Sequence, residues 1–324
     1  MFYLKFFKFL IVILISVIYF ISVGNINQYI QTSSSSTYIK WVDFNITNAA
    51  LNDTVKVDIS TYGSKRHFNW IDLLVCLALD NGGDFRNYKT EKLNKLVEKL
   101  NNGETVESIT EGKKLKSYYK EAYTAVLGGM VGEFELDGEK KYGLKAFSPI
   151  AKGYNFNHYD DFGSSRSYGY KRNHLGHDIM GSIGTPVIAV ESGYVEAVGW
   201  NQYGGWRIGI RSFDGLRYYY YAHLRKNHPY NDIYEGKIVN SGEVIGYLGM
   251  TGYSAKENVN NINVPHLHYG LQLIFNPVQK DGVNQIWIDM YELTKFLNQN
   301  RSEVYKSGDE YYNAHTVIDS LTPD

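Results

Sequence analysis

Between residues 64 and 135, apolar side chains recur three and four positions apart, which is the spacing of one face of an α-helix. Asn69 stands where a helix through Leu79 would take its N-cap, and Thr90 stands where a second helix would take one. A third helix is expected to end at the glycines within residues 128–132. The apolar positions of the second and third helices are Leu93, Leu96, Val97, Leu100, Tyr119, Ala122, Tyr123, Val126 and Met130. The pattern predicts a small helical module over residues 64–135.

In the second half of the chain the apolar runs become short, and Gly, Asn, Asp and Ser separate them, which is typical of strands joined by turns. The runs are TPVIAV, GYVEAVGW, WRIGIRS, RYYYYAHL, EVIGYLGM and HLHYGLQLI. The Asp214-Gly215 pair between two of them is a strong hairpin signal. We therefore predict a compact, mainly antiparallel β domain over residues 136–285. Within the C-terminal segment 286–324, an amphipathic helix near residues 287–300 is expected to cover one edge of this domain.

Residues 25–63 show a weaker pattern. The stretch QTSSSST is a polar linker without periodicity. From Tyr38 to about Ser60, apolar and polar residues alternate in KWVDFNI and VKVDI, and a period of two predicts short strands. The chain as a whole is therefore expected to belong to the α+β class, with a small helical module preceding the β domain.

The first 24 residues indicate export. Lys5 and Lys8 precede an uncharged apolar run from Phe9 to Val23. This run is at the upper limit for the core of a signal peptide and short for a membrane-spanning helix, which needs roughly 20 residues. A cleaved signal peptide and a retained N-terminal membrane anchor both stay open. Both place the rest of the chain outside the cytoplasm, with membrane contact only through residues 1–24.

The composition narrows the function classes. A formal net charge of −1 lacks the electrostatic footprint of a protein that binds nucleic acid. The 29 tyrosines would suit recognition of carbohydrate or peptide, but strand content and core packing are the favoured explanation. The one cysteine, Cys76, lies in an apolar helical run and is expected to be a small core residue.

The chemistry gathers in the predicted β domain. In VPHLHY, His266 and His268 are one residue apart, so in a strand both imidazoles face the same side. NHLGHDIMG adds His174 and Asp178, and YYAHLR adds His223. A catalytic zinc site needs three nitrogen or oxygen ligands and one open position. The candidates exceed that number, which leaves histidines over for proton transfer, although a tyrosine-rich strand could also hold His223 as a structural residue.

These motifs resemble those of a known family. HxxxD with an internal glycine, then YxHL, then HxH after a GxxGxS segment, is similar to the pattern of the M23 (LytM/lysostaphin-type) peptidoglycan endopeptidases. The segments GTPVIAVESGYVEAVGW, KIVNSGEVIGYLGMTGYS and PHLHYG also resemble the core strands and loops of the family, in the same order. The resemblance covers about residues 145–275 and implies an M23-type β peptidase domain.

The resemblance also implies a role for each candidate. His174, Asp178 and His268 correspond to the ligands of one Zn²⁺ per chain, and His223 and His266 to the two catalytic histidines. Such an enzyme hydrolyses the peptide cross-links of bacterial peptidoglycan outside the cell, in the cell wall. Zinc lowers the pKa of its bound water to about 7, and neighbouring imidazoles can move the protons. Tyr221 is expected to lie close enough to His223 to line a groove.

Two features depart from the family pattern. SAKENVNNIN lengthens the segment before Val264, and a loop at the rim of the cleft is expected there. His177 stands where the family usually has an apolar residue, and it is expected beside the ligands or on the surface. The helical module is not part of the family core, so a wall-binding unit, a site for a protein partner within residues 64–135, and a cover over the active site all stay open.

The main rival function is a membrane-anchored M23-like scaffold of the sporulation or division type, with little or no hydrolysis. Members of that kind usually lack one or more ligands or catalytic histidines. Here all five positions are filled, which favours the enzyme.

Overall fold

The computed structural model describes residues 38–168 and 170–323, of which those from Lys40 onward form one compact unit. The predicted leader, residues 1–24, lies outside the described residues. None of the helices that the structure describes is both long enough and apolar enough to cross a membrane.

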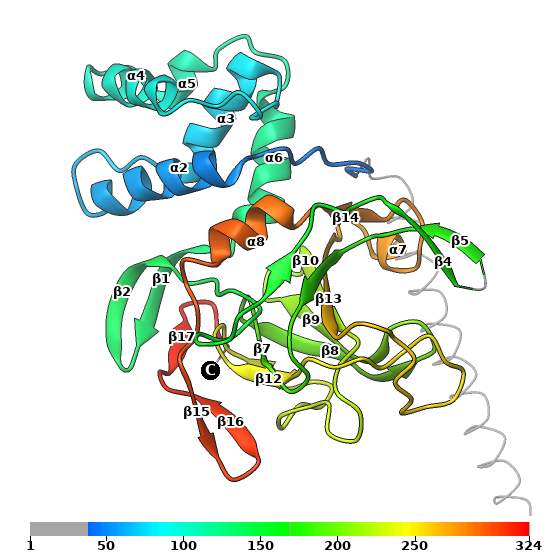
Figure 1. The fold of residues 1–324 in the computed structure, drawn as a ribbon. Helices are drawn as coiled ribbons and strands as arrows, with labels where there is room; N and C mark the ends of the chain where they lie inside the picture. Colours follow the sequence, from blue (N-terminus) through cyan, green and yellow to red (C-terminus); the bar gives the residue numbers. More distant parts are fainter. Residues whose placement is uncertain (1–37, 169, 324) are drawn as a thin grey trace, which may run out of the picture. The chain divides into compact units, whose positions relative to one another are not determined.

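Helices precede the β domain, as expected (Figure 1). They are α2 (Asn48–Thr61), α3 (Trp70–Asn81), α4 (Thr90–Asn101), α5 (Val106–Ile109) and α6 (Lys116–Leu127). Asn69 caps α3 as predicted, because its Oδ1 accepts hydrogen bonds from the backbone N–H groups of Ile71 and Asp72. Gly128 is the C-cap of α6. Cys76 is buried in α3, and burial raises the pKa of its thiol to about 11, so it is the core residue that the sequence predicts.

The short strands expected between Tyr38 and Ser60 are not present: residues 38–47 form no helix or strand, and the residues that follow form the helix α2. Thr47 begins the helix by accepting a hydrogen bond from the N–H of Ala50 on its side-chain oxygen. The buried positions of α2 recur at helical spacing and are Ala50, Leu51, Thr54, Val55 and Asp58. Over so short a stretch the sequence VKVDI fits a period of two as well as a helix, and packing against α3 decides between them.

Two further helices differ from the prediction at their ends. The second predicted helix has Lys89 at its N-cap, and the hydroxyl of Thr90 donates to Asp53 of α2 at 2.7 Å instead of capping its own helix. The C-terminal helix α8 covers only Tyr291–Leu297, because Ile286–Ile288 form the strand β14 and pair with another strand. That strand pairing overrides the helical pattern of the sequence.

The C-terminal helix links the helical module to an edge of the sheet. Phe296 stacks on Trp70 of α3 with ring centroids 5.8 Å apart. At the other end of α8, the ring of Tyr291 lies 5.1 Å from that of His158, which belongs to the edge strand β3 (Asn157–His158). The helix therefore reaches a sheet edge, as expected.

The centre of the β domain is an eight-stranded antiparallel sheet. In spatial order its strands are β11 (Ile238–Val239), β8 (Gly193–Asn201), β9 (Gly205–Ser212), β10 (Arg217–Ala222), β13 (His266–Leu273), β6 (His177–Met180) and β3, with β14 pairing with β13. The predicted hairpin joins β9 to β10, and Gly215 adopts φ +76° within it. The antiparallel β architecture is thus confirmed.

Smaller sheets surround this one. They are β17 (Val317–Asp319) with β1 (Val131–Leu136) and β2 (Glu139–Leu144), β12 (Val244–Tyr247) with β7 (Pro186–Ile188), β15 (Val304–Ser307) with β16 (Glu310–Asn313), and β4 (Ser165–Tyr168) with β5 (Tyr170–Asn173). A short helix, α7 (Pro277–Lys280), follows β13.

The two faces of the central sheet differ in polarity. On one face the side chains of Ile208, Tyr221 and Tyr269 form a row across three strands, and all three are fully buried. Tyrosines thus build much of the core, which accounts for part of their number. The opposite face carries His266 and His268 and is more open to solvent.

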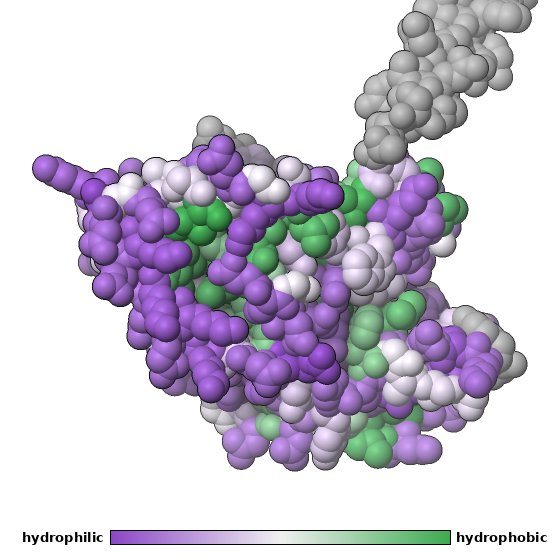
Figure 2. All heavy atoms as spheres, turned by 90° about the horizontal axis from the view of Figure 1, so that it is seen from above, coloured by the Kyte–Doolittle hydropathy of each residue, from purple (hydrophilic) through white to green (hydrophobic). Residues whose placement is uncertain are grey.

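The outer surface of the helical module is polar. In α4 the residues Leu93, Leu96 and Leu100 are buried, whereas its lysines and glutamates point outward. Figure 2 shows hydrophilic residues over most of one face of the molecule, with smaller hydrophobic areas between them.

A buried ion pair joins the helical module to the sheet. Arg217 of β10 is 1% exposed and binds Glu191 with two hydrogen bonds, of 2.7 and 2.9 Å. Its remaining nitrogen donates to the carbonyl of Ala125 at 2.8 Å, in the last turn of α6, where carbonyls lack helical partners. The hydroxyl of Tyr219 donates to Glu191 at 2.7 Å. Because both charges are out of water, each depends on the other.

We expect Arg217→Ala to destabilise the protein by about 3–5 kcal/mol, because it leaves the carboxylate of Glu191 buried without its partner. The double variant Arg217→Met with Glu191→Leu should recover most of this loss, since it removes both charges and retains the volume. Chemical denaturation measures the free energy of unfolding. Arg86→Ala, which breaks an exposed ion pair with Asp84, is the control and should leave it unchanged. Equal stability of Arg217→Ala and the control would contradict this view of the ion pair.

Candidate metal centre

Three neighbouring strands place the candidate residues on one face of the central sheet. β13 lies between β10 and β6, and His268 pairs directly with Asp178 on one side and with Ala222 on the other. Paired residues of antiparallel strands share a face, so Asp178 and His268 point to the same side. His174 precedes β6 in a loop, and its backbone N–H donates to the carbonyl of Ser164 at 2.9 Å.

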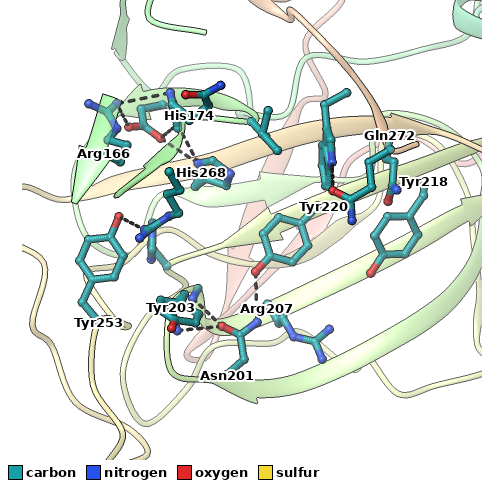
Figure 3. Close-up of a pocket in the computed structure, with 18 of the residues that line it drawn as sticks. Arg166, His174, Asn201, Tyr203, Arg207, Tyr218, Tyr220, Tyr253, His268 and Gln272 are labelled. Carbon is teal, nitrogen blue, oxygen red and sulfur yellow. Dashed lines mark hydrogen bonds and ion pairs between the residues drawn. The ribbon is translucent and has the colours of Figure 1, made fainter. Parts of the chain in front are cut away.

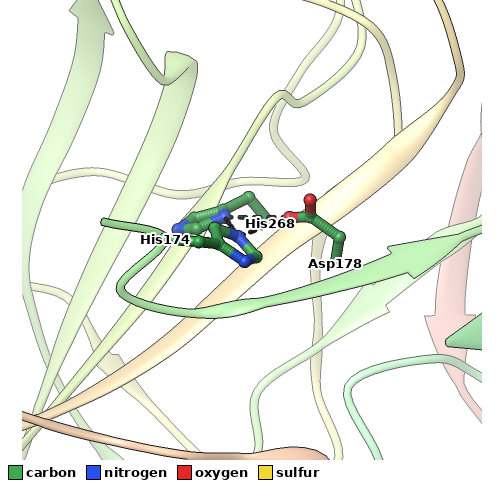
Figure 4. A group of neighbouring side chains, drawn as sticks. All are labelled: His174, Asp178 and His268. Carbon is green, nitrogen blue, oxygen red and sulfur yellow. Dashed lines mark hydrogen bonds and ion pairs between the residues drawn. The ribbon is translucent and has the colours of Figure 1, made fainter. Parts of the chain in front are cut away.

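Three ligand atoms converge at this point. His174 Nε2 lies 3.0 Å from Asp178 Oδ1 and 3.1 Å from His268 Nδ1, and the distance from His268 Nδ1 to Asp178 Oδ1 is 3.0 Å. Figure 4 shows the three side chains directed toward one another. Ligands about 2.0–2.1 Å from a tetrahedral ion would be roughly 3.3 Å apart. Two imidazole nitrogens and one carboxylate oxygen at this spacing therefore fit a divalent metal ion.

Outer contacts hold two of the three ligands in place. Arg166 donates to Asp178 Oδ2 at 3.0 Å, so the other carboxylate oxygen remains directed at the histidines. The Nδ1 of His174 lies 3.3 Å from the backbone carbonyl of Asp161. When Nδ1 carries the proton and donates to this carbonyl, Nε2 is free to bind the metal.

The electrostatics favour the metal-binding forms of Asp178 and His268. Burial raises the pKa of Asp178, but hydrogen bonds from His174 and His268 outweigh it and hold the pKa well below its usual range. Burial lowers the pKa of His174, and its contact with Asp178 outweighs this and raises it. The pKa of His268 is lowered, because burial and the nearby His174 and His266 disfavour its positive charge. Asp178 thus stays ionised and His268 neutral near neutral pH.

The two remaining histidines flank this centre. His266 Nδ1 lies 2.8 Å from the carbonyl of Val264, and His223 Nδ1 lies 2.8 Å from the carbonyl of Thr251. Donation to these carbonyls leaves Nε2 of each ring as a proton acceptor. The ring centroids are 4.8 Å apart, and His266 Nε2 is 3.7 Å from Asp178 Oδ1. The structure therefore brings together all five side chains that the sequence singles out.

His223 owes its position to an unusual backbone conformation. Its φ is +60°, which is uncommon for a residue other than glycine. The regular alternation of β10 ends at Ala222, and the left-handed residue that follows turns the imidazole toward the metal centre. Burial, and the charges of the nearby histidines, lower the pKa of His223 to about 3, so the ring is neutral near pH 7.

The expectation that Tyr221 lines a groove is wrong. Tyr221 is fully buried on the core face, where its hydroxyl accepts a hydrogen bond from the N–H of Val190. The preceding residue, Tyr220, faces the cleft instead. The error has a simple cause, because His223 leaves the strand alternation and no longer shares a face with Tyr221.

Glycine makes room for one of the ligands. A Cβ added to Gly176 would lie 2.5 Å from His268 Cε1 and 2.6 Å from its Nε2. Real Cβ atoms do not approach so closely, so the backbone at Gly176 is what allows the imidazole of His268 to pass. The glycine inside the HxxxD motif is therefore required by packing.

The metal centre opens into a cleft of about 370 Å³ (Figure 3). Arg166 and Arg172, from the β4–β5 hairpin, line one wall, and Arg172 donates to the hydroxyl of Tyr253 at 2.9 Å. Tyr203 and Tyr253 are further wall residues. None of these four was a candidate in the sequence, although the arginines on both sides of the sequence YGY, just before His174, are a signal for such a wall.

The lengthened loop starts at the cleft. Tyr253, directly before the insertion, lines the cleft, while Asn258 within it accepts hydrogen bonds from Trp206 Nε1 at 3.0 Å and from the N–H of Asn227 at 2.8 Å. The insertion is therefore anchored to the start of β9 and to the loop that follows β10.

His177 faces away from the metal centre. It is 1% exposed, and its Nε2 lies 2.8 Å from Nδ1 of His158 in β3. The ring of Tyr291 covers both histidines at 5.1 and 5.9 Å. His177 is thus buried behind the ligands, and His158 has a partner that the sequence does not reveal, because 19 residues separate the two.

Comparisons of this sequence with known proteins find similar peptidases. Residues 172–282 match the sequence model of Peptidase family M23. The chain is 38% identical over 159 residues to the L-Ala–D-Glu endopeptidase of Bacillus subtilis (strain 168), which is 48% of this chain and 47% of that protein. It is 41% identical over 97 residues to lysostaphin of Staphylococcus simulans, which is 30% of this chain and 17% of that protein. The chain thus matches less than half the length of each relative.

A solved structure has a similar fold over most of the chain. The lytM structure from Ruminococcus gnavus superimposes with a TM-score of 0.55 over 85% of this chain and 96% of that chain, at 23% identity. At this identity the likeness concerns the fold.

We expect His174→Ala, Asp178→Ala and His268→Ala each to lose tightly bound metal, because each removes one of three converging ligand atoms. His266→Ala should retain about one divalent ion per chain, because its nitrogen is not part of the set. Elemental analysis after dialysis measures the metal content. If His266→Ala lost the metal and one of the other three kept it, the ligand set would be wrong.

Gly176→Ala should weaken metal retention roughly 10–100-fold without removing a ligand, because the added methyl group displaces His268. A competition titration with a chelator measures the affinity. Gly132→Ala is the matched control, since a Cβ there meets nothing closer than 3.6 Å. Unchanged affinity in Gly176→Ala would show that the close contact does not position the ligand.

Proposed function

We propose, from the match of residues 172–282 to peptidase family M23, that the protein is a zinc-dependent endopeptidase that hydrolyses peptide cross-links of bacterial peptidoglycan. The observation that carries the proposal is the geometry of five side chains. Three of them present ligand atoms 3.0–3.1 Å apart, and two further histidines direct free ring nitrogens toward the same space.

His174, Asp178 and His268 would hold one Zn²⁺ per chain. Two imidazoles and one carboxylate, with an open side toward the cleft, form the ligand set of a catalytic zinc site. Zinc bound there would polarise the carbonyl of the scissile amide and lower the pKa of water to about 7.

The chain's own residues would move the protons. His266 is a neighbour of the metal ligands, and its Nε2 is free to accept a proton because Nδ1 is held by the carbonyl of Val264. His223 is neutral at physiological pH and is oriented in the same way by Thr251. An imidazole that accepts a proton at Nε2 can return it to the departing amine. Two such rings, with centroids 4.8 Å apart, can accept a proton at the start of the reaction and donate one to the departing amine at its end.

The walls of the cleft would orient the peptide. Tyr203 and Tyr253 are partly buried rings with polar ends, and Arg172 lies over both at 5.3 and 5.2 Å. A peptide bound between these rings would be partly desolvated, and its amide would be aligned with the metal centre.

The rest of the chain fits an exported enzyme. We propose that residues 1–24 direct export, either as a cleaved signal or as an anchor, and that the protein acts in the cell wall. We further propose the module of residues 64–135 as a unit that can bind a protein partner, ahead of a peptidase domain over residues 136–285 and a C-terminal segment 286–324. The scaffold alternative would not need His223 and His266, and their presence with defined hydrogen bonds favours the enzyme.

The full chain loaded with zinc should release fragments from purified peptidoglycan, with new amine and carboxyl ends at a peptide bond. Mass analysis of the released fragments identifies the bond. His266→Ala should lower the rate at least about 100-fold, because a positioned base contributes that much. Removal of zinc with EDTA should stop the release, and added zinc should restore it. If the folded, zinc-loaded protein released nothing from several wall types, the scaffold alternative would be favoured.

A further inference from the structure

The cleft continues along the sheet beyond the metal centre. Residues on this face of the sheet form successive rows across β9, β10 and β13: Arg207 and His268 at the level of Ala222, then Gly209, Tyr220 and Gly270, then Arg211, Tyr218 and Gln272. Of these, Arg207, His268, Tyr220, Tyr218 and Gln272 line the cleft. The face of the sheet that carries the third metal ligand is therefore also the floor of the cleft. Figure 3 shows Tyr220 between the metal centre and Tyr218, with Arg207 beside Asn201.

Glycines let aromatic rings lie flat over this floor. A Cβ at Gly209 would meet the hydroxyl of Tyr218 at 2.0 Å, and one at Gly204 would meet that of Tyr220 at 2.2 Å. A Cβ at Gly270 would lie 2.8 Å from the ring of Trp287. A side chain at any of these glycines would displace an aromatic residue of this face, so the glycines let the rings approach the backbone.

Two of the four cationic side chains that line the cleft are paired with carboxylates. Arg166 pairs with Asp161 and Asp178, and Lys280 pairs with Glu196. Asp178 is the only carboxylate among the described residues that line the cleft, and it belongs to the metal centre. The cleft therefore has an excess of positive charge.

Arg207 differs from these cations. Within residues 38–168 and 170–323, its guanidinium has no ion pair with a carboxylate, and its Nε is buried without a hydrogen-bond partner. Arg207 lines the same cleft as Tyr218 and Tyr220. Burial raises the pKa of both tyrosines, and the positive charge of Arg207 opposes that rise. The half-buried guanidinium thus lines the cleft with a positive charge that no described carboxylate neutralises, and such a charge is costly unless a ligand pairs with it.

We infer that Arg207 binds a carboxylate of the substrate, so that the enzyme selects acidic peptides over runs of glycine. The inference rests on the proposed function, which makes the ligand a peptide, and the anions of a peptide are carboxylates. A guanidinium matches a carboxylate with two parallel hydrogen bonds. Arg207 and His268 are two strands apart, about 10 Å between backbones, so the carboxylate lies within about three residues of the amide that is cut.

The test uses two peptides that differ in one group. One carries a glutamate residue next to an alanine, as in an acidic wall peptide, and the other carries the same residue as its carboxamide. Calorimetry measures their binding to the full chain with the His266→Ala substitution, which prevents turnover. We expect the carboxylate peptide to bind at least about tenfold more tightly. Arg207→Gln in this background should remove the difference, and Arg207→Lys should retain part of it.

Arg211→Gln is the matched control. It removes the same type of side chain from the same face of β9, but Arg211 is already paired with Glu196 at 2.6 Å. It should leave the preference for the carboxylate intact. Equal binding of the two peptides by the parent protein, or an equal loss of preference in Arg211→Gln and Arg207→Gln, would overturn the inference.

Kinetics then separate this inference from the proposed function. If the protein with His266 restored cuts both peptides at the same KM and Arg207→Gln does not change it, the function stands and the role of Arg207 is refuted. If neither peptide is cut but binding still depends on the carboxylate and on Arg207, the site for the carboxylate stands and the endopeptidase does not.

Discussion

The candidate site depends on the position of one strand. β13 lies between β10 and β6 in the central sheet, and its pairing sets His268 opposite Asp178 on one side and level with the end of β10 on the other. A shift of one residue in this register would turn both histidines into the core and bring Leu267 and Tyr269 to the cleft. The burial of Leu267, Tyr269, Leu271 and Leu273 on the core face opposes such a shift. The apolar half of the strand thus determines where the polar half points.

Close backbone contacts form the second constraint. Gly176 lets His268 approach, and Gly204, Gly209 and Gly270 let aromatic rings lie over the strands. A glycine in a strand interior weakens the strand, so such positions need a compensating gain. Here the gain is a cleft whose floor is aromatic and whose end holds three ligands. The left-handed backbone of His223 belongs to the same pattern, since a strained residue at the end of β10 turns its imidazole into the site.

Much of the site was visible in the sequence, and so was part of the fold. The two histidines of HLH face one side because strands alternate, and the antiparallel hairpin at Asp214-Gly215 follows from its turn residues. Local patterns failed where a contact distant in sequence decides the outcome. Residues 48–61 are helical because they pack on α3, and Ile286–Ile288 are extended because they pair with β13. Tyr221 was misassigned because the prediction assumed a regular strand through His223.

The sequence by itself determined most of the helices and strands, the five candidate side chains and the family resemblance, because each depends on spacing within a few residues. Only the tertiary structure decided which groups share a space. Three arrangements join segments far apart in the chain. His158 contacts His177, and Arg217 binds Glu191 and the carbonyl of Ala125. Arg207 lies two strands from His268. The order of the strands creates these neighbours, and no local pattern of residues specifies which strands lie side by side.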